Sequence, residues 1–266
     1  MLAPVEIAGV ASCVPARVVT NFELEKLVDT SDEWISKRTG IKTRHIAVEE
    51  TAVGMAAQAS AEALAMSGVG KDDIGLIVAC TVSGDNLTPA IASSVQRALD
   101  IPRCAAMDIS AGCTGFIYAL ETARAILCHN PRPALIIGSE MMSRIVDWSD
   151  RNSCILFGDA AGAVVLEVDQ KESGGIWHSI LKADGAGSQL IFREGGARGL
   201  PGGMPLIQHT LQMKGRAVFN FAVKVFDDVL CRLLERSGYT FDDLACVVPH
   251  QANARIVEAV ARRMGV

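Results

Sequence analysis

Residues 105–128 read AAMDISAGCTGFIYALETARAILC, and this stretch is the best guide to the fold class. It begins as a short apolar run, turns at the small residues 110–112, and continues with Phe116, Leu120 and Leu127 at helical spacing. Residues with that spacing lie on one face of a helix. The stretch therefore predicts a strand, a tight corner and a buried helix, an arrangement typical of layered α/β proteins.

Cys113 lies at the start of the predicted helix. Free backbone N–H groups and the positive end of the helix dipole favour a thiolate at such a position. Gly112 and Gly115 leave space around the sulfur for a substrate. Judged from these residues alone, Cys113 is compatible with two roles, a small buried hydrophobe or a nucleophile.

The composition narrows the class of protein. Half of the 266 residues are apolar and 5% are aromatic, which suits helices packed closely on a sheet. The net charge of −5 argues against nucleic acid as the main partner. The eight cysteines include no CxxC pair, so we expect reduced thiols and no metal site. No uncharged apolar run approaches the length of a membrane span, and we expect a cytoplasmic protein without a membrane partner.

Apolar runs and helical patterns alternate along the first half of the chain. We expect a strand pair within residues 4–19, followed by a helix capped at Thr20. Further helices are expected at 50–66 and 90–99, and further strands at 74–81, 134–140 and 157–168. This alternation predicts a mainly parallel sheet with helices on both faces.

Part of this pattern recurs 170 positions later. The first series consists of a helix, Ser67-Gly68, an acidic pair and a strand. The second half repeats it with a helix, Ser237-Gly238, an acidic pair and the run CVVPH. A duplicated unit can bring one catalytic group from each half to a common site. We therefore expect an N-terminal half at 1–170 and a partial C-terminal half at 171–266, which lacks a counterpart of the Cys113 helix.

Four stretches together resemble the β-ketoacyl-acyl-carrier-protein synthase III family of the thiolase superfamily. They are DTSDEWISKRTGI (29–41), AGCTGF (111–116), SDRNSCILFGDAAGAVVLE (149–167) and PHQANARI (249–256). The resemblance implies an α/β fold of duplicated βαβαβαββ units in α/β/α/β/α layers. Here the second half is expected to be incomplete. The family's catalytic asparagine has no counterpart up to Val266, and we expect a C-terminally truncated chain.

The resemblance also implies roles for single residues. Cys113 would take an acyl group from acyl-CoA as a thioester, and His250 would polarise the malonyl thioester during decarboxylation. A lone histidine beside a proline is more often a structural hydrogen-bonding residue, and it is the position of His250 within PHQAN that favours the catalytic role. The expected coenzyme A contacts are Trp34, Arg38, Arg151 and Asn253.

The same resemblance implies the partners and substrates. Acyl-CoA and malonyl-acyl carrier protein would be substrates, with no cofactor, and the chain would form a homodimer. The cations expected to dock the carrier protein are Lys214, Arg255, Arg262 and Arg263. Judged by charge alone, a solvated surface explains them equally well. Thr88 would line the primer pocket, and its small side chain predicts primers longer than acetyl.

Three functions remain open from the sequence. The first is the decarboxylating condensation of acyl-CoA with malonyl-acyl carrier protein, which starts fatty-acid or related chain synthesis. The second is a Cys113–His250 acyltransferase of specialised metabolism that performs no condensation. The third is a catalytically impaired, truncated homologue that at most binds a partner.

Overall fold

The computed structural model describes residues 4–168, 174–194 and 210–265. The contacts divide the chain into two compact units, and each is described by itself. Unit 1 comprises Met1–Val18, His45–Met142 and Gly158–Leu181, and unit 2 comprises Val19–Arg44, Ser143–Phe157 and Lys182–Val266. The predicted boundary between halves at 170 lies outside the described residues.

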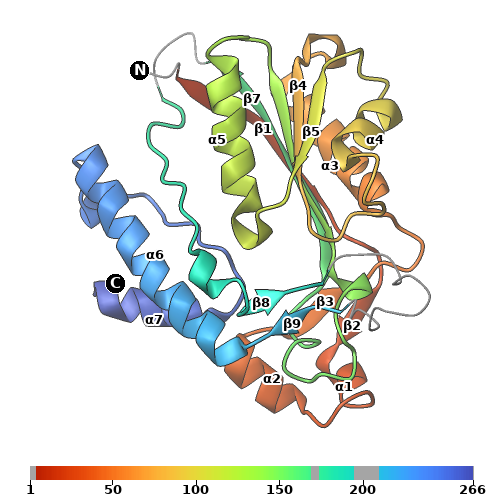
Figure 1. Cartoon of the computed structure of the whole chain (residues 1–266), viewed down its shortest axis with the longest axis vertical. Coiled ribbons are helices and arrows are strands. Elements are labelled where there is room, and N and C mark those ends of the chain that lie inside the picture. Colours follow the sequence, from red (N-terminus) through yellow and green to blue (C-terminus); the bar gives the residue numbers. More distant parts are fainter. Residues whose placement is uncertain (1–3, 169–173, 195–209, 266) are drawn as a thin grey trace, which may run out of the picture. The chain divides into compact units, whose positions relative to one another are not determined.

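Unit 1 is built on a five-stranded sheet with the order β1-β7-β6-β4-β5 (Figure 1). Its strands are β1 (Val5–Cys13), β4 (Leu76–Cys80), β5 (Ala105–Ile109), β6 (Ala134–Met141) and β7 (Asp159–Val168). β4 pairs in parallel with β5 and β6, whereas β7 runs antiparallel to both β6 and β1. β1, β4, β5 and β6 therefore run in one direction, and the predicted parallel pairing holds among β4, β5 and β6. It fails at β7, because an apolar run identifies a strand without giving its direction.

Helices cover both faces of this sheet, as predicted. In Figure 1, α3 (Ala52–Ser67) and α4 (Ile91–Ala98) lie on one face, and α5 (Gly115–Leu127) lies on the other. Side chains of a strand alternate between the two faces. Ile77 and Ile137 accordingly join the core under α3 and α4. Val78 and Ile136 join the core under α5.

Two carboxylates fix the starts of the helices on the first face. Asp85 accepts hydrogen bonds from the backbone N–H groups of Ala52 and Val53 at 3.1 and 2.8 Å, at the N-terminus of α3. Asp108 of β5 accepts in the same way from the first N–H groups of α4 at 2.7 and 3.0 Å. Each carboxylate satisfies donors that a helix leaves free and complements its dipole. α3 ends as predicted, with Gly68 as its left-handed cap.

Unit 2 is mainly helical. Its helices are α1 (Asn21–Leu24), α2 (Asp32–Thr39), α6 (Gly215–Ser237) and α7 (Ala254–Met264), and a small sheet pairs β8 (Ile191–Phe192) with β9 (Gln212–Met213). A capping box between Thr20 and Glu23 starts α1 as predicted, but the helix is a single short turn.

Two predicted strand arrangements differ from the structure. The run at residues 4–19 does contain two strands, but β1 joins the five-stranded sheet while β2 (Val18–Thr20) pairs with β3 (Thr43–His45). Residues 246–250, the predicted second-half strand, are not a strand. Val248 there is 83% exposed. No strand in the described part of the chain pairs with this segment, and an extended run without a neighbour forms no sheet.

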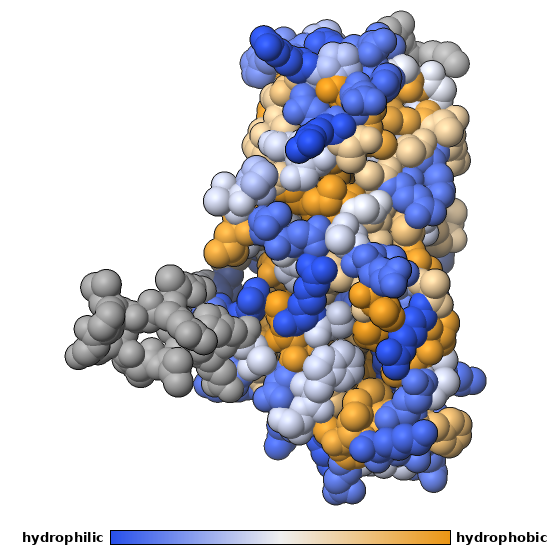
Figure 2. Space-filling model, turned by 90° about the vertical axis from the view of Figure 1, so that its right-hand side faces the viewer, coloured by the Kyte–Doolittle hydropathy of each residue, from blue (hydrophilic) through white to orange (hydrophobic). Residues whose placement is uncertain are grey.

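No helix among the described residues is long and apolar enough to cross a membrane. On the face drawn in Figure 2, hydrophobic residues lie in separate patches between hydrophilic ones. Within residues 4–168, 174–194 and 210–265, no three or more His, Cys, Asp or Glu side chains form a cluster that could hold a metal ion.

Candidate active site

The corner that carries Cys113 forms as predicted. β5 ends, a 3₁₀ turn spans Gly112–Thr114, and α5 follows directly. Gly112 has a φ of +53°, in the left-handed region that favours glycine. The Thr114 hydroxyl donates to the Ala111 carbonyl at 2.9 Å and tightens the turn. The side chain of Cys113 is exposed, so a reactant in solution can reach the sulfur.

The charge state of Cys113 differs from the expectation. Desolvation raises the pKa of the thiol, the backbone N–H of Cys113 lowers it by less, and the charge of Glu140 raises it further. Although the residue is exposed overall, the protein packed around it makes desolvation the largest of these effects. The direction of this shift favours the thiol form, opposite to the predicted helix-end thiolate.

The floor under this corner is closely packed. A Cβ on Gly115, the first residue of α5, would lie 2.9 Å from the Cβ of Cys80 at the end of β4. A Cβ on Gly138 of β6 would lie 3.4 Å from the Cys80 sulfur. Burial raises the pKa of the Cys80 thiol to about 12. Cys80 is thus a neutral packing group, and Gly115 lets α5 approach the sheet directly behind the nucleophile candidate.

Glu140, at the end of β6, was missed by the sequence analysis. Its carboxylate accepts from the Val82 backbone N–H at 2.9 Å, from the Thr81 hydroxyl at 3.2 Å, and from the Ser83 hydroxyl. Desolvation raises its pKa in spite of these bonds. The residue fixes the loop that leaves β4 beside the Cys113 corner. Its only sequence signal is a carboxylate after the apolar run ALIIG.

His250 lies in unit 2, in the segment that leads into α7. Desolvation lowers the pKa of its imidazole, so the ring is neutral at pH 7. A neutral imidazole can accept a proton at one nitrogen and donate a hydrogen bond from the other. Its expected role in polarising a thioester needs a donor, which this form supplies.

The start of α7 is fixed from two sides. The Asn253 side chain, expected to contact coenzyme A, caps the helix by accepting from the Arg255 backbone N–H at 2.9 Å. Gly40, the left-handed cap of α2, lies so close to Ala254 that a Cβ on Gly40 would come within 2.9 Å of the Ala254 Cβ. The Arg255 guanidinium donates to the Lys37 carbonyl at 3.2 Å. The segment that carries His250 is thereby anchored on α2.

The structure brings together three of the expected coenzyme A contacts. The guanidinium groups of Arg38 and Arg151 lie 4.5 and 4.7 Å from the ring centroid of Trp34. Arg151 also donates to the carbonyl of Asp29 at 2.7 Å. Two cations stacked on one indole form a surface suited to a planar base and to phosphate. The sequence separates Arg151 from Trp34 by more than a hundred positions, yet both belong to unit 2.

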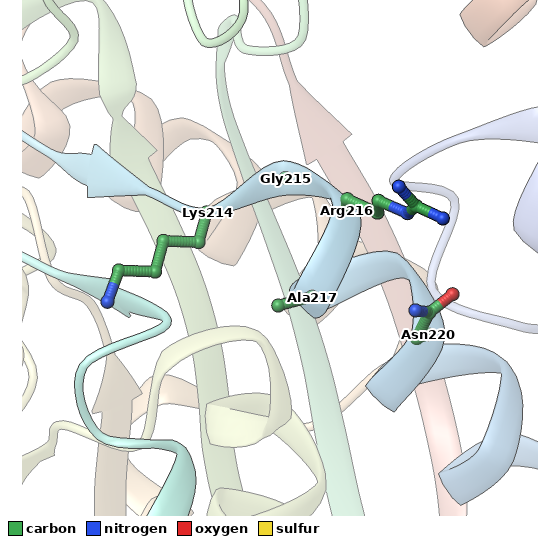
Figure 3. A pocket seen from close by; sticks show the side chains of 5 residues that line it. All are labelled: Lys214, Gly215, Arg216, Ala217 and Asn220. Carbon is green, nitrogen blue, oxygen red and sulfur yellow. The ribbon is translucent and has the colours of Figure 1, made fainter.

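The expected docking cations differ in their surroundings. The Arg263 guanidinium pairs with the Asp227 carboxylate of α6 at 2.9 Å. Lys214 and Arg216 border an open pocket of about 450 Å³ at the start of α6. Figure 3 shows their side chains extending to opposite sides of the helix start. Arg262 lies beside Arg263 in the last turn of α7, and both are exposed.

Thr88, expected in the primer pocket, is exposed in the loop between β4 and α4, in unit 1. It precedes Pro89 through a cis peptide bond. Cys113 belongs to the same unit, whereas His250 and the Trp34 cluster belong to unit 2. The roles predicted for these residues, and their meeting at one site, remain predictions.

Comparison with known proteins decides the family. The family model for 3-oxoacyl-[acyl-carrier-protein] synthase III matches residues 107–185, and the model of its C-terminal part matches 234–266. The β-ketoacyl-[acyl-carrier-protein] synthase III of Erythrobacter litoralis is 48% identical over 97% of this chain and 80% of its own length. The chain belongs to the β-ketoacyl-acyl-carrier-protein synthase III family. The enzyme of the same name from Symbiobacterium thermophilum is 43% identical over 98% of this chain and 81% of its own length.

Solved structures agree with this family. The synthase III structure from Aquifex aeolicus matches with a TM-score of 0.88 at 39% identity, over 98% of this chain and 81% of that one. The structure from Pseudomonas aeruginosa matches with a TM-score of 0.90 at 35% identity, over 99% of this chain and 80% of that one. The predicted family, the thiolase-like α/β fold class and the acyltransferase class of enzyme are confirmed.

Proposed function

We propose that this synthase III condenses an acyl-CoA primer with malonyl-acyl carrier protein, with loss of carbon dioxide, and so starts the synthesis of an acyl chain. The observation that carries the proposal is the exposed Cys113 on its glycine corner, in a chain of this family. No cofactor takes part, because the thiol and the two thioesters supply the reacting groups.

In the first half-reaction, the Cys113 sulfur attacks the acyl-CoA carbonyl. The carbon–sulfur bond to coenzyme A breaks, and coenzyme A leaves as a thiol. Because burial favours the protonated form of Cys113, the attack needs a proton acceptor. His250 suits that task, since its lowered pKa keeps the imidazole neutral. The backbone N–H of Cys113, at the start of α5, is a candidate donor to the oxyanion.

In the second half-reaction, malonyl-carrier protein loses carbon dioxide. The electron pair of the broken bond forms an enolate, and a hydrogen bond from His250 to its oxygen would stabilise the charge. The enolate carbon attacks the acyl-Cys113 carbonyl, which releases the cysteine as a thiolate that takes up a proton. The product is 3-oxoacyl-carrier protein.

Trp34 with its two arginines would bind the nucleotide end of coenzyme A. A purine stacked between the indole and a guanidinium needs two contacts of about 3.5 Å each. The present separations of 4.5 and 4.7 Å are shorter than that sum. One arginine must therefore move outward on binding, where it can pair with a phosphate. Asn253, at the N-terminus of α7, would contact the pantetheine arm of coenzyme A.

The remaining assignments belong to the same proposal. The carrier protein, which is acidic in this family, would dock on the cations Lys214, Arg255, Arg262 and Arg263. Thr88 would line the primer pocket and admit primers longer than acetyl. We further propose a cytoplasmic homodimer, with a duplicated architecture divided near residue 170.

The proposal is tested by mixing the protein with octanoyl-CoA and malonyl-carrier protein labelled in the carboxyl carbon. Released labelled carbon dioxide, dependent on both substrates, is expected. Acyl transfer to an acceptor without carbon dioxide release would favour a Cys–His acyltransferase, and no turnover of either kind would contradict an enzymatic role. Turnover with octanoyl-CoA as primer is expected to be faster than turnover with acetyl-CoA. The variant Thr88→Phe is expected to reverse that order.

A further inference from the structure

Asn21 and Arg44 of unit 2 have almost fully buried polar side chains, which is costly unless they are well bonded. Asn21 has no exposed surface and Arg44 is 5% exposed. The Nε atom of Arg44 is buried without a hydrogen-bond partner in the described part of the chain. The unit therefore retains a buried charge at some cost, and its bonds show what that charge holds in place.

Arg44 donates to three acceptors in two segments of the unit. One terminal nitrogen donates to the Val19 carbonyl at 3.3 Å. The other donates to the Asn21 Oδ1 atom at 2.8 Å and to the Ile155 carbonyl at 3.2 Å. Ile155 follows Arg151 in the segment Ser143–Phe157. Arg44 thus ties that segment, and the arginine it carries, to Asn21.

Asn21 completes the connection to α2. Its Nδ2 atom donates to Asp32 Oδ1 at 2.8 Å and to the Ile41 carbonyl at 2.8 Å. It also lies 3.3 Å from the Ser36 hydroxyl, which in turn donates to Asp32 Oδ1. Asp32 and Ser36 lie two positions on either side of Trp34 in α2. The amide therefore holds the turn that presents the indole.

We infer that Asn21 and Arg44 are positioning residues for acyl-CoA binding. They fix α2, with Trp34, relative to the segment that carries Arg151. The inference rests on the proposed function, since it assumes that this cluster binds coenzyme A. Arg151 also contacts Asp29 directly, through the carbonyl at 2.7 Å and the carboxylate at 3.4 Å, but both side chains are exposed and an exposed ion pair contributes little. The buried network is a second link, shielded from solvent, between α2 and the segment that carries Arg151.

The variant Asn21→Asp tests the hydrogen bonds that Asn21 donates independently of the one that it accepts from Arg44. The new carboxylate keeps the acceptor for Arg44, but it places an oxygen against Asp32 Oδ1 and the Ile41 carbonyl, where the amide now donates. The link to α2 is lost, while the link to Ile155 is kept. Asn21→Asp combined with Asp32→Asn exchanges donor and acceptor and restores one of the lost bonds. Asn130→Asp, at an exposed site in unit 1, is the matched control.

Binding of free coenzyme A is measured by calorimetry in the Cys113→Ala protein, together with the rate of Cys113 acylation against acyl-CoA concentration in the otherwise unchanged protein. For Asn21→Asp we expect the dissociation constant of coenzyme A to rise about tenfold. The acyl-CoA concentration that gives half-maximal acylation should rise by a similar factor. The maximal acylation rate should stay within about twofold. The double variant should recover most of the loss, and Asn130→Asp should bind like the parent.

Several outcomes would overturn the inference. One is unchanged binding by Asn21→Asp, and another is a fall in the maximal acylation rate at unchanged half-saturation. If Asn21→Asp does not fold, Arg44→Lys is measured in its place. Lysine keeps the charge but cannot reach all three acceptors, and unchanged coenzyme A binding by that variant would overturn the inference too. If the parent protein itself binds no coenzyme A, the proposed function fails first.

Discussion

Two regions of the molecule share a local sequence but lead into different structures. α3 ends at Gly68 and α6 at Gly238, each with φ of +74° and each donating its N–H to the carbonyl four residues back. The serine before each glycine bonds a leucine carbonyl of the last turn, at 2.9 and 3.0 Å. A 3₁₀ turn containing an acidic pair comes next in both regions, at Lys71–Asp73 and Phe241–Asp243.

The two regions differ in the element that follows this turn. β4 follows the first turn and lies buried between β5 and β6. Residues 246–250 follow the second turn and form no strand. Local sequence is enough for the helix ends, because the cap residues satisfy their own backbone groups. It is not enough for a strand, whose backbone groups need partners on neighbouring strands.

Aspartate at equivalent positions should show the largest difference between the regions. Val78 is fully buried in β4, and Val248, which occupies the same place in the second region, is 83% exposed. Val78→Asp places a charge in the core under α5 and should lower the free energy of unfolding by about 4 kcal/mol or more. Val248→Asp should change it by less than about 0.5 kcal/mol. Denaturant unfolding measures both, and similar losses would contradict the comparison.

The next effect concerns Cys80, the last residue of β4, whose counterpart in the second region is His250. Gly115→Ala brings a Cβ to 2.9 Å from the Cys80 Cβ. This overpacking should cost about 1–3 kcal/mol and displace Cys113, which slows its acylation. Adding Cys80→Gly removes the opposing atom and should restore the acylation rate. A Gly115→Ala protein with full activity would show that the corner tolerates the shift.

The two capping glycines should behave alike. Gly68→Ala and Gly238→Ala each place a Cβ on a left-handed residue with open space around it. The cost is conformational and should be about 1 kcal/mol at each position. The matched measurement is thermal or denaturant unfolding of the two single variants. Losses that differ by more than twofold would mean that the surroundings, and not the cap itself, decide the effect.

The smallest effect is the pH dependence that His250 contributes. Its pKa is lowered by desolvation, so the folded state favours the neutral ring. The stability contributed in this way is present above the ordinary histidine pKa of about 6.5 and is lost as pH falls through the lower folded value. An NMR titration of the His250 ring should give a midpoint below 6.5. A midpoint above it would mean that a charge partner outweighs burial.

The sequence was sufficient where chemistry is local. Ser67-Gly68 correctly predicted the end of α3, and the corner at Gly112 correctly predicted Cys113 just before α5. The motifs around Cys113 and His250 gave the family. Each of these features depends on a few neighbouring residues whose preferences agree.

The rest depends on distant partners. The antiparallel course of β7 follows from its pairing with β1 and β6, which no periodicity encodes. The raised pKa of Cys113 comes from burial and from Glu140, a residue of another strand. The buried Asn21 and Arg44 gave no signal at all, because polar residues in a polar stretch are expected at the surface.

Covalent acylation of Cys113 tests the account most directly. The protein is incubated with octanoyl-CoA, and its intact mass is measured beside that of Cys113→Ala. We expect one octanoyl group on the parent chain, released coenzyme A in equal amount, and no addition to the variant. Octanoylation that persists in Cys113→Ala, or a folded parent chain that takes up no acyl group, would contradict the assignment of Cys113 as the nucleophile.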